Sequence, residues 1–68
     1  MIEVGKTYRS KAYKHQTYRL IGIGTNSAGI ELVFYEFYVN GKLSLRKPYL
    51  IHRLTSFLNW IDTTNPLV

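Results

Sequence analysis

Residue types that carry catalysis or bind metals are sparse in this chain of 68 residues. It has no cysteine, its only imidazoles are His15 and His52, and no histidine pair has a metal-ligand spacing such as His-x-x-x-His. No serine or threonine lies in a nucleophile-elbow motif. The acidic residues are Glu3, Glu31, Glu36 and Asp62. We therefore expect no enzymatic activity, no metal site and no cofactor.

The pair Gly22 and Gly24, around Ile23, is the closest approach to a nucleotide-binding motif. It lacks the third glycine of a dinucleotide loop and precedes a turn rather than a helix. Glycines inside a strand pattern more often mark a bend or a close approach of backbone in a barrel strand. We expect that structural role here.

Aromatic and basic residues are interleaved in the stretch "YRSKAYKHQTYR", residues 8–19, with Tyr-Arg or Tyr-Lys pairs every five residues. The segment from Val4 to Ile30 contains five Lys or Arg and no Asp or Glu, and the formal net charge of the whole chain is +5. Clustered positive charge favours a polyanionic partner such as nucleic acid or an acidic protein face. Aromatic rings add the ability to stack on bases.

The elements that position these residues are mainly strands. Asn40-Gly41 suits a type I′ turn between two strand-forming runs, which predicts an antiparallel hairpin over residues 30–47. Residues 17–25 and 4–10 predict two further strands, and "NSAG" at 26–29 supplies the turn before the hairpin. No linker or repeat interrupts the chain. We expect one domain, residues 1–68, built on a meander of about four strands.

The hairpin turn predicts the pairing of its strands. Val39 should lie opposite Lys42, Tyr38 opposite Leu43, and so on as far as Tyr35 opposite Arg46. The predicted core face carries Ile30, Leu32, Phe34, Tyr38, Leu43 and Leu45, interrupted by Glu36. The predicted solvent face carries Val33, Tyr35, Phe37, Lys42, Ser44 and Arg46. A single-residue bulge would exchange the two faces beyond it, and Glu36 on the core face is a sign of one.

After Pro48 the apolar period becomes helical. Leu50, Ile51, Leu54, Phe57, Leu58 and Ile61 share one face of a helix, which predicts a helix over about 50–61. Pro48 suits the start of a helix and Pro66 prevents its continuation. The alternative is a short 3₁₀ turn followed by a closing strand, "TSFLNWI". Either form would cover the sheet.

The order Tyr13-Lys14, Tyr18, Gly22, "ELVFYEFY" and "LSLRKP" is similar to an uncharacterised family of short bacterial proteins expected to form SH3-like barrels. The resemblance covers residues 8–48, and Lys47 separates Arg46 from Pro48 where the family has Arg-Pro. It implies an SH3-like barrel. Together with the strand and helix patterns, it leads us to expect a mainly β (α+β) fold: an SH3-like, strongly curved antiparallel meander of about four to five strands with a short C-terminal helix. It implies no activity.

Nucleic-acid binding is the function that the interleaved pattern favours. The rings expected to stack on bases are Tyr13, Tyr18, Tyr35 and Phe37. The basic side chains expected to neutralise phosphates are Arg9, Lys11, Lys14, Arg19, Lys42 and Arg46. The competing interpretation is that the tyrosines lie at the edge of the core with their hydroxyls outward.

The alternative function is protein binding, either as a homodimer or by docking on an acidic partner protein, as a phage-type inhibitor or adaptor would. Tyr49, Arg53, Ser56 and Trp60 fall together outside the apolar stripe of the predicted helix. Aromatic residues and arginine are enriched at interface hot spots. Trp60 would otherwise fold back over the edge of the sheet.

The chain has no apolar run near the roughly 18 residues of a membrane span. Its first residues, "MIEVGKTYRS", lack the basic-then-apolar order of a signal peptide. We expect a cytoplasmic protein without a membrane partner.

Overall fold

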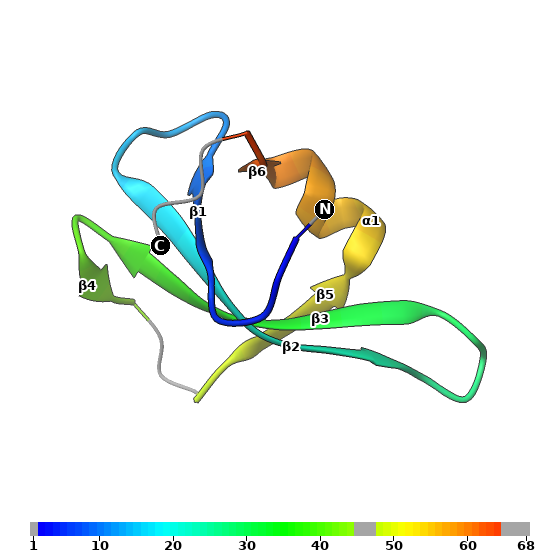
Figure 1. Ribbon diagram of the computed structural model, residues 1–68. Coiled ribbons are helices and arrows are strands. Elements are labelled where there is room, and N and C mark those ends of the chain that lie inside the picture. The colour runs from blue at the N-terminus through cyan, green and yellow to red at the C-terminus, as the bar shows by residue number, and fades with distance from the viewer. Residues whose placement is uncertain (1, 45–47, 65–68) are drawn as a thin grey trace.

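The computed structural model describes residues 2–44 and 48–64 (Figure 1). These residues form an antiparallel sheet and one short helix, in the order β1 (Thr7–Ser10), β2 (Gln16–Thr25), β3 (Glu31–Val39), β4 (Lys42–Leu43), β5 (Leu50–Arg53), α1 (Leu54–Trp60) and β6 (Ile61–Asp62). The predicted mainly β fold with a short C-terminal helix is confirmed.

The sheet follows the path β4-β3-β2-β1-β6 and is open. Strands β4 and β5 both pair with the edge of β3 that β2 leaves open. Strand β4 pairs with the end of β3, at Tyr38 and Val39, and β5 pairs with its first half, Leu32 to Tyr35. Tyr35 therefore lies opposite Leu50. The predicted pairing of Tyr35 with Arg46 was wrong. Leu45, Arg46 and Lys47 lie outside the described residues, so the predicted burial of Leu45 and exposure of Arg46 stay predictions.

The two predicted turns are confirmed. Asn40 and Gly41 have φ values of 53° and 78°, as a type I′ turn requires, and Tyr38 lies opposite Leu43. The turn at 26–29 is held by the Asn26 side chain, whose Oδ1 accepts hydrogen bonds from the backbone N–H groups of Ala28 and Ile30 at 2.9 and 3.0 Å. Asparagine favours turns because its short side chain can bond to nearby backbone in this way.

The predicted choice of core face was wrong. Val33 and Tyr35 are buried, whereas Leu43 keeps 51% of its surface exposed. Helix α1 covers the face that carries Val33 and Tyr35, and the Phe57 ring lies 5.1 Å from the Tyr35 ring between centroids. The opposite face, which we call the outer face, carries Glu36. The carboxylate of Glu36 therefore does not have to be buried in the core, as the predicted core face would have required.

Gly22 and Gly24 lie beneath the Phe34 ring, across the strand pair. A Cβ at Gly22 would come within 3.2 Å of Phe34 Cδ2, and one at Gly24 within 3.3 Å of Phe34 Cε2. The register also shifts between Leu20 and Gly22, so β2 bulges at that point. The irregular strand agrees with the predicted bend, whereas the close neighbour of the two glycines is the Phe34 side chain rather than backbone.

The predicted helix over 50–61 was too long. Its first four residues form β5, and only Leu54–Trp60 are helical before Ile61 returns to an extended conformation with φ −106° and ψ 153°. Two causes favour this outcome. A helix of about 12 residues is marginal by itself, and the open edge of β3 offers hydrogen bonds to β5. The alternative of a closing strand holds only for Ile61–Asp62.

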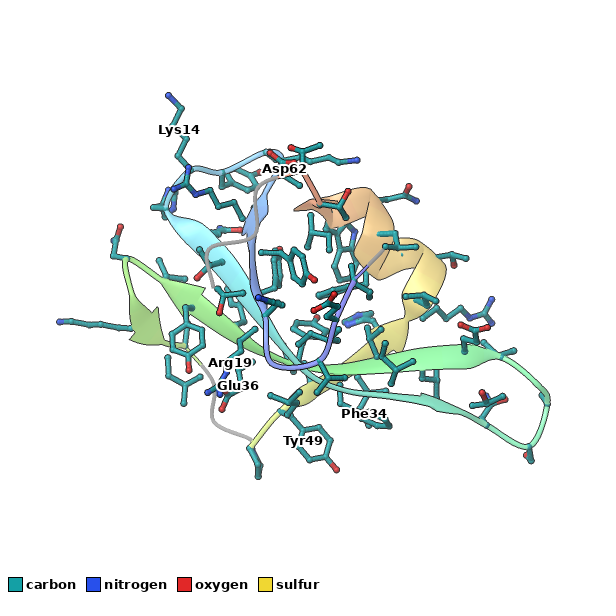
Figure 2. The ribbon with its side chains drawn as sticks, in the orientation of Figure 1. Lys14, Arg19, Phe34, Glu36, Tyr49 and Asp62 are labelled. Atoms are coloured by element: carbon teal, nitrogen blue, oxygen red, sulfur yellow. The ribbon has the colours of Figure 1, made fainter. Side chains whose placement is uncertain are left out.

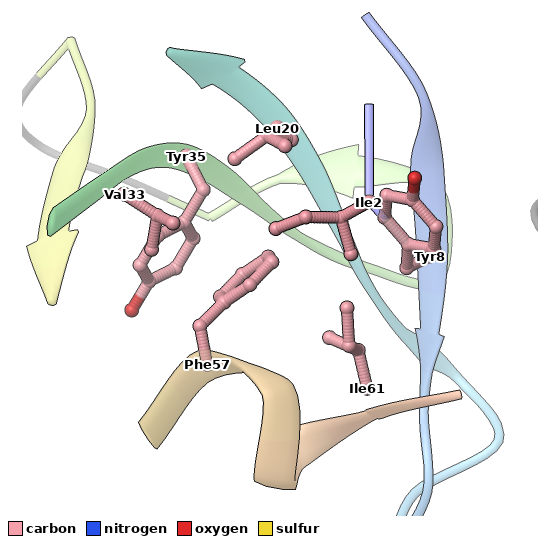
Figure 3. Close-up of a cluster of buried hydrophobic side chains, with 7 residues drawn as sticks. All are labelled: Ile2, Tyr8, Leu20, Val33, Tyr35, Phe57 and Ile61. Atoms are coloured by element: carbon pink, nitrogen blue, oxygen red, sulfur yellow. The ribbon is translucent and has the colours of Figure 1, made fainter. Parts of the chain in front are cut away.

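The core lies between the sheet and α1, and its side chains come from nearly every part of the described chain (Figure 3). Its buried members are Ile2, Tyr8, Leu20, Val33, Tyr35, Phe57 and Ile61. Phe57 is the only fully buried residue of the helix, and Leu54 and Trp60 pack against the core beside it. The N-terminal segment is tied down because the Glu3 N–H donates to the Tyr8 hydroxyl at 2.8 Å.

Phe57→Ala should destabilise the protein by about 3 to 5 kcal/mol, because it leaves a cavity at the centre of a small core. Most of the stability of a domain this small would be lost. Urea or thermal unfolding followed by circular dichroism measures the change. Leu58→Ala is the matched control, since Leu58 is the next helical residue and is 37% exposed. Equal losses in the two variants would contradict this account of the core.

Tyr35 links the core to a histidine at the surface. Its hydroxyl lies 2.8 Å from Nδ1 of His52, and the His52 ring makes an edge contact with Trp60 at 4.8 Å between centroids. Burial raises the pKa of Tyr35 to about 12, and the neighbouring Tyr18 hydroxyl adds to the rise. The neutral phenol is therefore the form that the folded protein requires.

Stability should fall as the pH rises through the window from about 10 to 12. Tyrosine in the unfolded chain ionises near pH 10, so above that pH the unfolded state holds fewer protons than the folded state and is favoured. The contribution is complete below pH 10 and its loss reaches about 2 kcal/mol at pH 12. Urea unfolding at a series of alkaline pH values measures the loss. Tyr35→Phe should flatten this part of the profile, and an unchanged profile in that variant would refute the assignment.

Candidate nucleic-acid interface

The loop between β1 and β2, residues 11–15, carries the centre of the interleaved stretch. Its backbone is ordered by Ser10, whose Oγ accepts hydrogen bonds from the N–H groups of Ala12 and Tyr13, each at 3.2 Å. The Lys11 N–H also donates to the Trp60 carbonyl at 2.9 Å, which fixes the loop to the end of α1. An ordered backbone holds the exposed side chains in place without occupying them.

The side chains of this loop point to solvent. Tyr13 is 56% exposed, the highest value of any tyrosine among the described residues, and Lys11, Lys14 and His15 are exposed beside it. The rings of Tyr13 and His15 meet edge to face with centroids 6.3 Å apart. Lys14 extends away from the body of the protein (Figure 2). The loop therefore presents an accessible ring between two lysines.

The β3–β4 turn lies at the same end of the molecule (Figure 1). The Asn40 N–H donates to the His15 carbonyl at 2.8 Å, so the turn and the loop are joined directly. Lys42 follows the turn and is exposed, as predicted. We call the surface formed by residues 11–15 and 40–42 the basic end. Of the predicted phosphate contacts, Lys11, Lys14 and Lys42 belong to it.

Arg9 lies next to the basic end but faces an acid. It is exposed on β1 directly opposite Asp62 of β6. The Thr64 side-chain hydroxyl and backbone N–H donate to Asp62, and with Lys11 and Arg9 they lower the pKa of that carboxyl. Asp62 is thus held in its charged form. It partly offsets the charge of Arg9.

Arg19 lies outside residues 11–15 and 40–42, and its charge is partly offset by an acid. It lies on the outer face, where its Nη1 is 3.7 Å from Oε1 of Glu36, and the Tyr38 hydroxyl donates to the same oxygen at 3.1 Å. The predicted role of Arg19 as a free phosphate contact is therefore weakened. Arg46 lies outside the described residues.

Three of the four rings predicted to stack on bases belong to the core side of the sheet. Tyr35 is buried, and Tyr18 and Phe37 are half-buried with their rings 5.1 Å apart between centroids. Tyr18 also meets Phe57 edge to face at 5.7 Å. These contacts correct the prediction: Tyr35 is not available for stacking, and only Tyr13 presents an open ring. The error follows from the wrong choice of core face.

The predicted protein interface does not form one surface. Because residues 50–53 are a strand, Tyr49 and Arg53 do not lie on the helix with Ser56 and Trp60. Tyr49 instead contacts Phe34 edge to face at 5.7 Å, on the side of the sheet away from α1 (Figure 2). Trp60 packs against the core, which is the alternative that the sequence left open.

Sequence reasoning missed the part that Tyr38, Thr7 and Thr17 play on the outer face. Thr7 lies opposite Arg19, and Thr17 lies between Arg9 and Tyr38. Alternation along each strand contains this signal, but the register between β1 and β2 depends on a five-residue loop and could not be read from the sequence. No group of three or more His, Cys, Asp or Glu side chains suited to a metal ion is present in residues 2–44 and 48–64.

The helix found in the described part of the chain is too short and too polar to cross a membrane. Comparison with protein-family models, with curated proteins and with solved structures finds no match in any of the three. The geometry and charges of the chain itself are therefore the basis for its function.

Proposed function

We propose that this protein is a small basic binding module without catalytic activity, which binds single-stranded nucleic acid at the basic end. The observation that carries the proposal is the hydrogen bond from the Asn40 N–H to the His15 carbonyl. It joins the loop that carries Tyr13, Lys11 and Lys14 to the turn that precedes Lys42.

The chemistry of this surface suits a single strand better than a duplex. An exposed ring stacks on an unpaired base, and lysines around it neutralise neighbouring phosphates without reading the sequence. Tyr13 supplies the ring, and the three lysines are exposed on two chain segments of one end of the molecule. The charge of Arg19 is offset by Glu36, so we assign it no phosphate.

We also propose that the fold is SH3-like and that the protein acts in the cytoplasm. Support for the fold comes from the strand order: β1, β2 and β3 form a meander, and the strand after the helix, β6, returns to pair with β1. The bulge in β2 gives the bend that such a curved meander needs.

The salt dependence of binding tests the basic end. Lys14→Gln together with Lys42→Gln should weaken binding to oligothymidylate and oligouridylate and lower the slope of log K against log salt by about 1.4, since each lost contact with a single strand contributes about 0.7. Fluorescence anisotropy over a salt series measures both. Folding should be unchanged, because exposed charges contribute little stability.

The matched control removes the same charge elsewhere. Lys6→Gln together with Arg53→Gln takes two positive charges from the residue before β1 and from the end of β5, outside the basic end. This variant should keep a salt slope close to that of the wild type. The proposal fails if both double variants bind equally, because net charge alone would then explain any affinity.

Tyr13→Ala should weaken binding by about 1 to 3 kcal/mol, the usual contribution of one base stacked on an aromatic ring. Tyr49→Ala is the control, since Tyr49 is also an exposed tyrosine but lies on the other side of the sheet. Anisotropy titrations at one salt concentration measure the difference. A larger loss for Tyr49→Ala would place the binding surface near β5 instead.

A second candidate function is self-association through β5. Ile51 is 48% and Tyr49 42% exposed, and β5 pairs with β3 alone among the described strands. Exposed edge strands with apolar side chains favour pairing with another chain. Analytical ultracentrifugation should then give twice the monomer mass, and Ile51→Lys should restore the monomer. Docking of an acidic protein partner would instead respond to the lysine double variant.

A further inference from the structure

A shallow groove of about 390 Å³ lies on the outer face. Strands β1, β2 and β3 supply most of its lining, and Gly5 and Gly41 stand at its rim. The lining residues are Gly5, Thr7, Thr17, Arg19, Tyr38 and Gly41. Sites for small ligands occupy about 300 to 1,000 Å³, so the groove has room for one group of modest size. Through Gly41 it reaches the β3–β4 turn, and hence the basic end.

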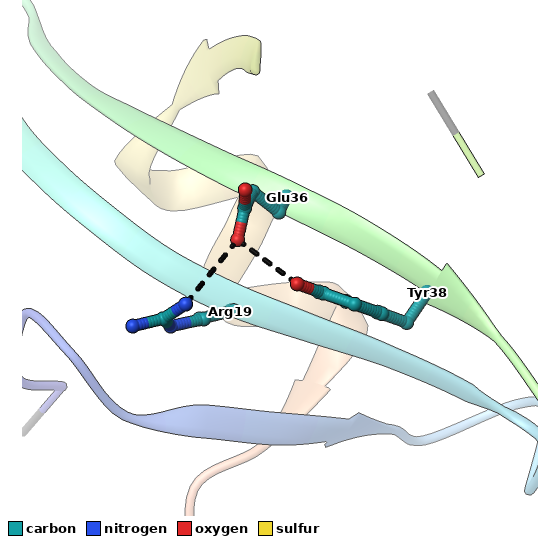
Figure 4. Close-up of polar contacts among 3 residues, drawn as sticks. All are labelled: Arg19, Glu36 and Tyr38. Carbon is teal, nitrogen blue, oxygen red and sulfur yellow. Dashed lines mark hydrogen bonds and ion pairs between the residues drawn. The ribbon is translucent and has the colours of Figure 1, made fainter. Parts of the chain in front are cut away.

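Two polar side chains of the groove, Arg19 and Tyr38, contact one carboxylate (Figure 4). Glu36 Oε1 accepts from the Tyr38 hydroxyl at 3.1 Å and lies 3.7 Å from Nη1 of Arg19. These contacts fix the Tyr38 ring along the groove and leave the other guanidinium N–H groups of Arg19, whose side chain is 52% exposed, available to a ligand. A site fixed in advance loses little entropy on binding.

The charge of the groove favours a neutral ligand over a phosphate. Glu36 offsets the charge of Arg19, so an anion would meet a carboxylate within a few ångströms of the guanidinium. A neutral group with acceptor atoms meets no such repulsion. Arg19 supplies donors, Thr7 and Thr17 supply hydroxyls that donate or accept, and Tyr38 supplies a flat ring.

We propose that this groove takes one base of the strand bound at the basic end and that guanine is the preferred base. Guanine presents O6 and N7 as a pair of acceptors, which matches two parallel N–H donors of an arginine. The Tyr38 ring also lines the groove, so it would pack against that base. This inference rests on the proposed function, because the basic end must first hold the strand.

The test compares two labelled oligonucleotides of equal length, one of thymine alone and one with a single central guanine. The guanine should tighten binding roughly 5- to 100-fold, the range that one bidentate contact provides. Replacing it by 7-deazaguanine, which lacks the N7 acceptor, should remove most of the gain. This arm uses the wild-type protein and so does not depend on how any variant folds.

Arg19→Gln should abolish the preference for guanine, while its affinity for the thymine oligonucleotide should match that of Lys6→Gln, which removes the same charge outside the groove. Circular dichroism checks the fold of both variants. Inorganic phosphate at millimolar concentration should leave the guanine gain unchanged, since a neutral base is the proposed occupant.

The outcomes separate this inference from the proposed function. Salt-dependent binding of the thymine oligonucleotide without any gain from guanine overturns the base site and leaves the basic end intact. A gain that survives both 7-deazaguanine and Arg19→Gln places base recognition elsewhere and also overturns it. A gain abolished by phosphate assigns the groove to an anion. Absence of binding to every oligonucleotide overturns both proposals.

Discussion

The packing of Phe57 against Tyr35 is the contact on which the rest of the structure depends. Helix α1 has seven residues, and Phe57 is the one that is fully buried, with Leu54 and Trp60 packed against the core beside it. The Phe57 ring selects the face of β3 that is inside. Once Val33 and Tyr35 are buried, alternation along the strand sends Phe34, Glu36 and Tyr38 to the outer face.

The same constraint separates the aromatic residues by function. Tyr18 and Phe37 complete the core because they share the inner face with Tyr35. Tyr13 stays outside the core because it lies in a loop whose backbone is fixed by Ser10 and by the end of the helix. One of the rings in the interleaved stretch is thus left for binding. The hydrogen bond of Asn40 to the loop brings the turn that precedes Lys42 to the same end of the molecule as Lys11 and Lys14.

Local signals in the sequence predicted the parts of the fold that local chemistry decides. The Asn40-Gly41 turn and the pairing of Tyr38 with Leu43 each depend on residues next to one another in the chain or across one tight turn. The core face and the extent of the helix could not be predicted, because the first depends on Phe57 packing against Tyr35 and the second on β5 reaching the edge of β3, both across a distance in sequence. Leu50 and Ile51 fit a helical stripe and a strand equally well. The structure confirms only that the loop at residues 11–15 is exposed, and it buries Tyr35, which the sequence placed on the solvent face.

Amide chemical shifts recorded while oligothymidylate is added to the ¹⁵N-labelled protein test the central claim most directly. The account predicts that the shifts which change with ligand concentration cluster at residues 11–15 and 40–42, with smaller changes along Thr17 and Arg19. The chemical shifts of the amides in α1 and β5 should stay unchanged. Changes concentrated in residues 50–53, or spread evenly over the protein, would contradict the claim that the loop and the turn joined by the Asn40 hydrogen bond form the binding surface.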